Sequence, residues 1–285
     1  MTILVTGAAG GIGRSLVAGL PALGHRVRGF DRVEMPTGPV RSDGTVLDVD
    51  VDLDPAGPGV DHVIGELADG PALEHAMAEV DVVVHLAAIP TETSFATAMD
   101  SHVTGTWWVL EAMRRAGVPR IVLGSSNHAV GFHGRTDSLR VDARLRPDTF
   151  YGVAKAASEA LCSFYVDRHG LAAVMLRIGS FLDRPRSRRH LSTWLSPGDA
   201  ARLVAAAATA DLIALQNFAV VWGISNNTRG WWDLAPGRDI GYDPRDDAED
   251  FAAEIEAEPE TEQDVLDARW VGGPYTRILP VPDGR

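Results

Sequence analysis

A glycine-rich turn between a predicted strand and a predicted helix constrains this fold more than any other feature of the sequence. Thr2 to Val5 is a short apolar run typical of a buried strand, and Ile12 to Leu23 has the apolar spacing of a helix. Four glycines lie at the turn: Gly7, Gly10, Gly11 and Gly13. Glycine is needed where a turn takes a positive φ, where backbone approaches a pyrophosphate, or where a helix packs on a strand. The turn therefore predicts a dinucleotide-binding unit, with the phosphates at the helix N-terminus.

Strand-like and helix-like segments alternate along the rest of the first 178 residues. The expected strands are Val27–Phe30, His62–Ile64, Asp81–Leu86, Arg120–Gly124 and Ala172–Ile178, and the expected helices are Gly70–Glu79, Thr97–Ala116 and Tyr151–His169. Near-continuous apolar strands that alternate with helices are typical of a parallel sheet covered on both faces. We therefore expect an α/β protein with a Rossmann-type, doubly wound parallel sheet.

The sequence is irregular in two places. Met35 to Asp61 is rich in Pro, Gly and Asp, which favours an acidic surface loop or hairpin, although the strict apolar–acidic alternation from Leu47 to Asp54 leaves a surface strand as the alternative. After residue 178 we expect a helix at Asp199–Ala210, a strand at Phe218–Trp222 and an acidic helix from about Asp246 to Ala257. The prediction is a dinucleotide-binding core over residues 1–180 and a small substrate-covering region over residues 181–285 that does not fold independently.

The end of the second strand bears on the choice of cofactor. Asp31 lies there, where an acidic side chain accepts hydrogen bonds from the adenosine ribose and repels a 2′-phosphate. Its neighbour Arg32 argues the other way, because an arginine can accommodate that phosphate. The sequence favours NAD over NADP.

A tyrosine, a lysine and a serine predict the reaction chemistry. Tyr151 and Lys155, the only lysine in the chain, stand four residues apart and so share one face of a predicted helix. An ammonium beside a phenol stabilises the phenolate and lowers the phenol pKa from its ordinary value of about 10. Ser125 and Ser126 end a strand at the carboxyl edge of the predicted sheet, where ligands bind in such folds.

The glycine turn, the Tyr-x-x-x-Lys pair and the strand-ending serine together resemble the extended-type short-chain dehydrogenase/reductases, over nearly the whole chain. Five further runs resemble the uronate dehydrogenases of that family: Ser125–His128, Arg177–Ser180, Arg189–Trp194, Val220–Gly223 and Gly230–Asp233. The resemblance implies NAD-dependent oxidation of glucuronate or galacturonate at C1, giving an aldaric acid lactone. It also implies a homo-oligomer.

The resemblance assigns roles to individual residues. It makes Tyr151 the base, Lys155 its electrostatic partner and a ribose contact, and Ser126 the hydroxyl that orients the substrate oxygen. The implied substrate contacts are Ser126, Asn127, His128, Tyr151, Ser180, Arg189 and Thr91, the last replacing a family serine that falls on Pro90. The implied cofactor contacts are Gly7, Gly10, Gly11, Ile12, Gly13, Asp31, Arg32, Glu66, Leu67, Leu86, Ala87, Ala88, Tyr151, Lys155 and Ile178. His102 departs from the pattern, because the family has asparagine there.

Composition and length restrict the function classes. With 26 Lys and Arg against 39 Asp and Glu, the formal net charge of −13 argues against a nucleic-acid partner. The single cysteine, Cys162, excludes an intramolecular disulfide, and the nine histidines lack metal-ligand spacing, so we expect no metal site. Apolar runs too short to cross a bilayer, and the absence of a signal-like start, predict a cytoplasmic protein without a membrane partner.

Two alternatives to a uronate dehydrogenase remain open from the sequence. One is an epimerase, dehydratase or reductase of a nucleotide sugar or another small carbonyl compound. The 105 residues after Ser180 are few for binding a second nucleotide, which favours a small substrate. The other alternative is a nucleotide-sensing protein without catalysis, which would need neither Tyr151 nor Lys155.

Overall fold

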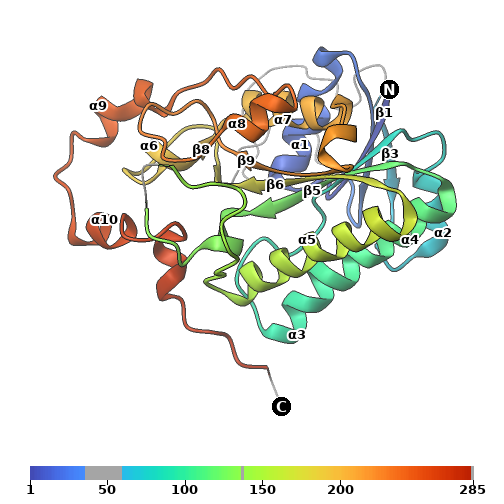
Figure 1. Ribbon diagram of the computed structural model, residues 1–285, viewed down its shortest axis with the longest axis horizontal. Coiled ribbons are helices and arrows are strands. Elements are labelled where there is room, and N and C mark those ends of the chain that lie inside the picture. The colour runs from blue at the N-terminus through green and yellow to red at the C-terminus, as the bar shows by residue number, and fades with distance from the viewer. Residues whose placement is uncertain (36–59, 136–137, 284–285) are drawn as a thin grey trace.

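The computed structural model describes residues 1–35, 60–135 and 138–283. Within them, seven strands form one parallel sheet in the order β3-β2-β1-β4-β5-β6-β9 (Figure 1). In sheet order the strands are β3 (Val60–Ile64), β2 (Arg26–Asp31), β1 (Thr2–Thr6), β4 (Val82–His85), β5 (Arg120–Ser126), β6 (Ala172–Ile178) and β9 (Phe218–Gly223). The predicted doubly wound parallel sheet is confirmed. The predicted loop at 35–61 lies almost wholly outside the described residues.

Helices cover both faces of the sheet, which explains why its strands are apolar without alternation. Ile3 and Val5 of β1 pack with α1 (Gly11–Gly19) and α7 (Pro197–Thr209) on one face. Leu4 of the same strand packs on the other face, which is covered by α2 (Gly70–Ala76), α4 (Gly105–Ala116) and α5 (Phe150–His169). In Figure 1 the first two helices lie above the sheet and the other three below it.

The strand order reverses at β1, which lies between β2 and β4. The connections after β1 and β4 therefore leave on opposite sides, and a crevice opens beyond their carboxyl ends. Both carboxyl ends are tied together by a hydrogen bond of 2.7 Å between Thr6 Oγ1 and His85 Nδ1. This crevice is the place where the fold puts a ligand.

Two predicted helices differ in detail from the structure. The helix expected from Ile12 to Leu23 ends at Gly19, because Pro21 begins a separate 3₁₀ turn, η1 (Pro21–Leu23). The helix expected at Thr97–Ala116 is present and extends to Phe95, as α3 (Phe95–Ala98), a π-helical stretch η2 (Met99–Thr104) and α4. Such π-helical stretches are frequent at functional sites.

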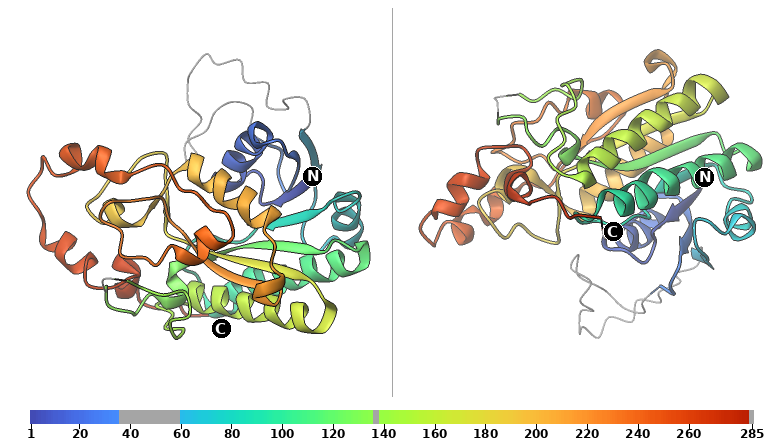
Figure 2. Two further views of the ribbon diagram at one scale, coloured as in Figure 1. Left: turned by 45° about the horizontal axis from the view of Figure 1, so that its top comes forward. Right: turned by 90° about the horizontal axis from the view of Figure 1, so that it is seen from below.

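The chain after β6 is irregular, as expected, but it completes the sheet. It contains β7 (Ser180–Phe181), α6 (His190–Thr193), β8 (Trp194–Leu195), η4 (Ile213–Leu215), α8 (Ala235–Asp239), α10 (Glu262–Asp267) and η6 (Gly273–Arg277), in addition to α7 and β9. Both views in Figure 2 place the last helices at one side of the molecule, and Figure 1 shows β5 and β6 pointing to that side. This region therefore covers the carboxyl edge of the sheet.

The predicted acidic helix from Asp246 to Ala257 is wrong in its length. The structure has a 3₁₀ turn, η5 (Ala248–Phe251), followed by a single turn, α9 (Ala252–Ile255). Only the two alanines that begin these turns are buried, so the segment lacks the apolar stripe that stabilises a longer helix. Among the described residues, no helix is long and apolar enough to cross a membrane.

Candidate active site

Two glycines of the turn after β1 lie too close to neighbouring backbone to carry a side chain. Gly7 has a φ of +73°, and a Cβ there would lie 2.7 Å from the backbone nitrogen of Ala87. A Cβ at Gly13 would lie 2.1 Å from the carbonyl oxygen of Gly7. Helix α1 begins after Gly10 with no side-chain cap, so its first N–H groups remain available to an anion. These features fit a bound pyrophosphate.

Asp31, at the end of β2, faces this turn. One carboxylate oxygen accepts a hydrogen bond of 2.9 Å from the backbone of Ala9, and the other accepts one of 3.4 Å from Val33. Asp31 and its neighbour Arg32 both line the cavity described below. The turn and the acidic side chain thus stand together where an adenosine ribose would be held.

One cavity of about 1160 Å³ runs from the glycine turn to Tyr275 near the C-terminus. It is lined by all fifteen positions implied as cofactor contacts: Gly7, Gly10, Gly11, Ile12, Gly13, Asp31, Arg32, Glu66, Leu67, Leu86, Ala87, Ala88, Tyr151, Lys155 and Ile178. Among the implied substrate contacts, Ser126, His128, Tyr151 and Ser180 line it, whereas Thr91, Asn127 and Arg189 do not. The cavity therefore joins the dinucleotide turn to the predicted catalytic residues.

Two side chains accept hydrogen bonds from the backbone N–H groups in the first turn of α5. Thr149 caps it by accepting a hydrogen bond of 3.1 Å from Gly152. The Glu92 carboxylate, from the loop after β4, accepts hydrogen bonds from the backbone nitrogens of Phe150 (3.0 Å) and Tyr151 (2.8 Å). Nothing in the sequence pattern predicted Glu92, because this contact joins residues 59 positions apart. It ties the start of α5 to a loop whose residues Ile89 and Pro90 line the cavity.

The Tyr151–Lys155 pair lies inside the protein. Lys155 is 8% exposed, and its Nζ donates a hydrogen bond of 2.5 Å to the carbonyl of Gly124. Burial lowers the pKa of Lys155 to about 8, although Glu159 acts to raise it. Burial also raises the pKa of Tyr151 to about 12, against the effect of a hydrogen bond with Ser126. The sequence predicted a lowered phenol pKa; in the structure burial outweighs the stabilising groups.

The two serines at the end of β5 have different partners. The Ser125 hydroxyl donates a hydrogen bond of 2.5 Å to the Glu159 carboxylate, which also accepts two hydrogen bonds from Arg177 (2.8 and 3.0 Å). Both serines line the cavity, but only Ser126 forms a hydrogen bond with Tyr151, whereas the Ser125 hydroxyl is already used by Glu159. This arrangement favours Ser126 over Ser125 as the hydroxyl that meets a substrate.

Two aromatic side chains beside Tyr151 complete the site. His102 lines the cavity with its ring edge-on to Tyr151, and burial lowers the pKa of His102 to about 3, so it is neutral. Its Nε2 lies 2.9 Å from the carbonyl of Ile89. Tyr275 stacks on His128 with ring centroids 4.2 Å apart. Sequence reasoning missed Tyr275, since only tertiary contact brings the C-terminal segment to the site.

Asn127 and Arg189 meet behind the cavity wall. Both donate to the carbonyl oxygen of Val271, Asn127 Nδ2 at 3.1 Å and Arg189 Nη2 at 2.7 Å. Nη1 of Arg189 is buried and has no hydrogen-bond partner in the described part of the chain. Burial, and then the charge of Arg135, lower the pKa of Arg189 to about 10. An unpaired buried guanidinium nitrogen is costly, so this position suits an anion.

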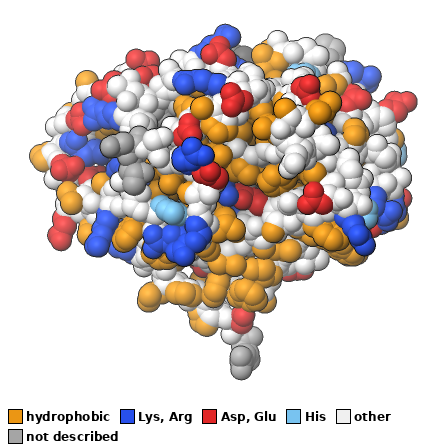
Figure 3. All heavy atoms as spheres, viewed as in Figure 1, with side chains coloured by type: hydrophobic (Ala, Val, Ile, Leu, Met, Phe, Trp, Pro, Cys, Tyr) orange, Lys and Arg blue, Asp and Glu red, His pale blue; other side chains and the backbone are white. Residues whose placement is uncertain are grey.

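Two arginines in the basic run before Arg189 pair with acidic side chains. Arg184 pairs with Glu254, and Arg188 pairs with Glu256 at 2.9 Å. Figure 3 shows blue and red side chains interspersed at the left, the side on which Figure 1 places α6, α9 and α10. The basic run before Arg189 is thus a charged surface loop rather than an exposed basic patch.

A crevice at the strand-order reversal, with a pyrophosphate-fitting glycine turn, is the dinucleotide-binding site of such sheets. Here it also reaches a tyrosine and a lysine that can move a proton, which together define an NAD-dependent dehydrogenase. Comparison with known proteins agrees with this class. The chain belongs to the NAD dependent epimerase/dehydratase family, whose model matches residues 3–217.

This chain is similar to known relatives and to solved structures over almost its full length. The uronate dehydrogenase of Pseudomonas syringae pv. tomato is 33% identical over 282 residues, which are 99% of this chain and 95% of that protein. The crystal structure of uronate dehydrogenase from Agrobacterium tumefaciens is 34% identical, covers 99% of this chain and 98% of its own, and superposes with a TM-score of 0.84. A variant of that enzyme complexed with NAD is 33% identical with 99% of each chain covered and a TM-score of 0.82.

Proposed function

We propose that this chain oxidises the C1 hydroxyl of a cyclic uronic acid, glucuronate or galacturonate, to an aldaric acid lactone while NAD is reduced to NADH. The observation that carries the proposal is the single cavity from the glycine turn to Tyr151, Lys155 and Ser126. Its support is the similarity, over nearly the whole chain, to proteins named uronate dehydrogenase. Bound NAD supplies the hydride acceptor.

The chain's own residues orient the sugar and move one proton. Tyr151 removes the proton of the C1 hydroxyl, and Ser126 holds the same oxygen from the end of β5. The charged Lys155, four residues along α5, stabilises the phenolate that this requires. Because the ring oxygen of the sugar stays in place, the product is a lactone.

Selection for a uronate requires a cation at the end of the sugar opposite C1. Arg189 is the candidate because its Nη1 is buried and lacks a partner among the described residues. Arg189 does not line the cavity and packs against the C-terminal segment, where a Cβ at Gly273 would lie 2.7 Å from Arg189 Nε. The carboxylate therefore reaches Arg189 through a shift of this segment, which also carries Val271.

The experiment follows NADH formation with glucuronate, galacturonate, glucose, galactose and UDP-glucuronate. Uronates should be the preferred substrates, and Arg189→Ala should raise their KM by about 30- to 1,000-fold, the loss of a charge-assisted bidentate contact. Activity on glucose or galactose should change much less. Arg189→Lys should restore only part of the affinity, because an ammonium lacks the planar fork.

Arg188→Ala is the matched control, since Arg188 is paired with Glu256 on the surface loop. It should leave the KM for uronates near that of the parent. Preference for UDP-glucuronate or a neutral sugar would reject the proposal. Normal uronate kinetics in Arg189→Ala, with loss in Arg188→Ala, would reject Arg189 as the carboxylate contact.

A further inference from the structure

A buried carboxylate lies behind His128 in the wall of the cavity. His128 Nδ1 and Asp148 Oδ2 are 2.9 Å apart. The Asp148 side chain is fully buried, and that of His128 is 13% exposed. Asp148 stands three residues before Tyr151, so this contact lies directly beside the proposed base.

Three glycines from separate segments make room for this carboxylate. A Cβ at Gly131, after η3 (Asn127–Val130), would lie 2.0 Å from Asp148 Oδ2, and one at Gly272 would lie 1.7 Å from it. A Cβ at Gly152 in α5 would lie 3.3 Å from Oδ1. At Gly131 and Gly272, any residue larger than glycine would clash with Asp148 in its present position. The C-terminal segment, α5 and the turn after β5 thus each place a glycine against the Asp148 side chain.

The contact decides which nitrogen of His128 carries the proton. An ionised carboxylate only accepts hydrogen bonds, so Nδ1 must be the donor. Thr149 Oγ1 lies 3.1 Å from the other oxygen, Oδ1, as a hydrogen-bond donor. In the neutral ring, Nε2 is then left with its lone pair. No residue of the described ranges gives Nε2 a partner.

The ring of His128 is placed to use that lone pair on a ligand. It lines the cavity edge-on to Tyr151, with ring centroids 5.8 Å apart, and its face is covered by Tyr275. Tyr151 fixes the oxygen at C1 of the proposed substrate, so the next substituent along the sugar is the C2 hydroxyl. Vicinal hydroxyls are close enough for adjacent side chains to hold one each.

We propose that Asp148 is a positioning residue that fixes His128 in the Nδ1–H tautomer, so that Nε2 accepts a hydrogen bond from the substrate's C2 hydroxyl. The ligand class is a cyclic sugar with a free hydroxyl next to the oxidised carbon. This inference rests on the proposed function for the identity of the sugar. The tautomer itself does not depend on that function.

The first test replaces Asp148 by asparagine, which keeps the shape and can turn its amide N–H groups toward Nδ1. His128 then adopts the Nε2–H tautomer and can no longer accept from the hydroxyl, as in the related substitution in serine proteases. We expect Asp148→Asn to lower kcat/KM for glucuronate about tenfold. With 2-deoxyglucuronate, which lacks the hydroxyl, the change should be less than about twofold. NADH affinity, measured by fluorescence, should not change.

Asp142→Asn is the control, because Asp142 is exposed and pairs with Arg140 on the surface, away from the cavity lining. It should behave like the parent with both substrates. Equal losses with glucuronate and 2-deoxyglucuronate in Asp148→Asn would overturn the inference and leave Asp148 a structural residue. Unchanged kinetics with glucuronate would overturn it too.

The second test needs no variant and no turnover. The ¹⁵N chemical shifts of the His128 ring in the labelled parent should report a protonated Nδ1 and an unprotonated Nε2 at pH 8. Protonation at Nε2 alone would overturn the inference even in a fully active enzyme. If the tautomer is as expected but no uronate is oxidised, the proposed function fails and the positioning of His128 stands.

Discussion

Tyr151 lies in surroundings that oppose the ionisation a base requires. Burial raises the pKa of its phenol to about 12, and burial also lowers the pKa of the neighbouring Lys155 to about 8. The ammonium is the group that yields its proton more easily in this structure. If Tyr151 is the base, as proposed, catalysis at neutral pH requires the two residues to act as one unit, with Ser126 favouring the phenolate by its hydrogen bond.

Replacing Tyr151 by phenylalanine tests the base directly. The ring keeps its packing against His102 and His128 while the ionisable oxygen is lost. We expect kcat to fall by about 10²- to 10⁴-fold, the usual contribution of a general base. NADH affinity should be retained, which fluorescence titration measures. A kcat within tenfold of the parent would remove Tyr151 from this role.

The pH dependence of the rate follows from the same pair. The active form carries one proton, on Lys155, and the resting form at low pH carries two. Since the lower of the two pKa values is about 8, kcat/KM should rise with pH up to about 8 and then level off. Lys155→Met removes the group with the lower pKa and leaves the buried Tyr151 phenol, whose pKa burial raises, so the rate of this variant should still be rising at pH 10. A pH profile of Lys155→Met that coincides with the parent's would contradict this reasoning.

At the scale of elements, the sequence predicted the features that depend on local sequence patterns alone. The strands follow from apolar runs, because a strand of a covered sheet is buried on both faces. The helices follow from a 3.6-residue apolar period, because each buries one face against the sheet. The turn after β1 was predictable because its glycines answer local steric demands, such as the positive φ of Gly7. Tyr151 and Lys155 were predictable for a similar reason, since four residues make one turn of helix.

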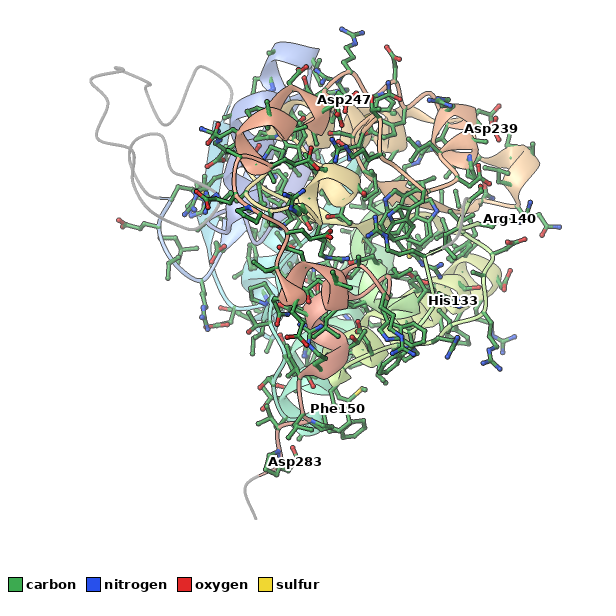
Figure 4. The ribbon with its side chains drawn as sticks, turned by 90° about the vertical axis from the view of Figure 1, so that its left-hand side faces the viewer. His133, Arg140, Phe150, Asp239, Asp247 and Asp283 are labelled. Carbon is green, nitrogen blue, oxygen red and sulfur yellow. The ribbon has the colours of Figure 1, made fainter. Side chains whose placement is uncertain are left out.

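Contacts between distant segments could not be predicted from such patterns. Asn127 meets Val271 across 144 residues, and Tyr275 reaches His128 from a segment with no regular period. Figure 4 shows Asp283, close to the C-terminus, at the same end of the molecule as Phe150, the first residue of α5. These contacts depend on tertiary packing, which a single sequence does not reveal.

We expect the end of β2 and the turn that it faces to determine the choice between NAD and NADP. Asp31 ends β2 and should repel the 2′-phosphate of NADP, so NAD should exceed NADP by at least about tenfold in kcat/KM, or roughly 1.4 kcal/mol. Asp31→Ala should narrow this gap, but it also removes the hydrogen bond to Ala9. Asp31→Asn is the matched variant, because it keeps an acceptor for Ala9 and removes only the charge. A parent enzyme that prefers NADP would show that Arg32 dominates.

At the scale of the whole molecule, the region after residue 180 is built into the core. Strand β9 pairs with β6 along six residues, and α7 covers the same face of the sheet as α1. A Cβ at Gly19 of α1 would lie 3.0 Å from Ala201 Cβ of α7, so the two helices are in close contact. Residues 181–285 therefore supply part of the packing on which the dinucleotide-binding half depends.

We propose on these grounds that residues 1–180 do not form an independent domain. Without β9 and α7, that fragment exposes the edge of β6 and the apolar side of α1, where Leu16 of α1 and Leu20 just after it are fully buried in the complete structure. Circular dichroism of the full chain should show one cooperative thermal transition, moved to higher temperature by NADH, which binds only the folded state. The 1–180 fragment should show no such transition and no response to NADH. A sharp transition in the fragment that NADH raises would mean that the two regions are separate domains, and that residues 181–285 only cover the substrate.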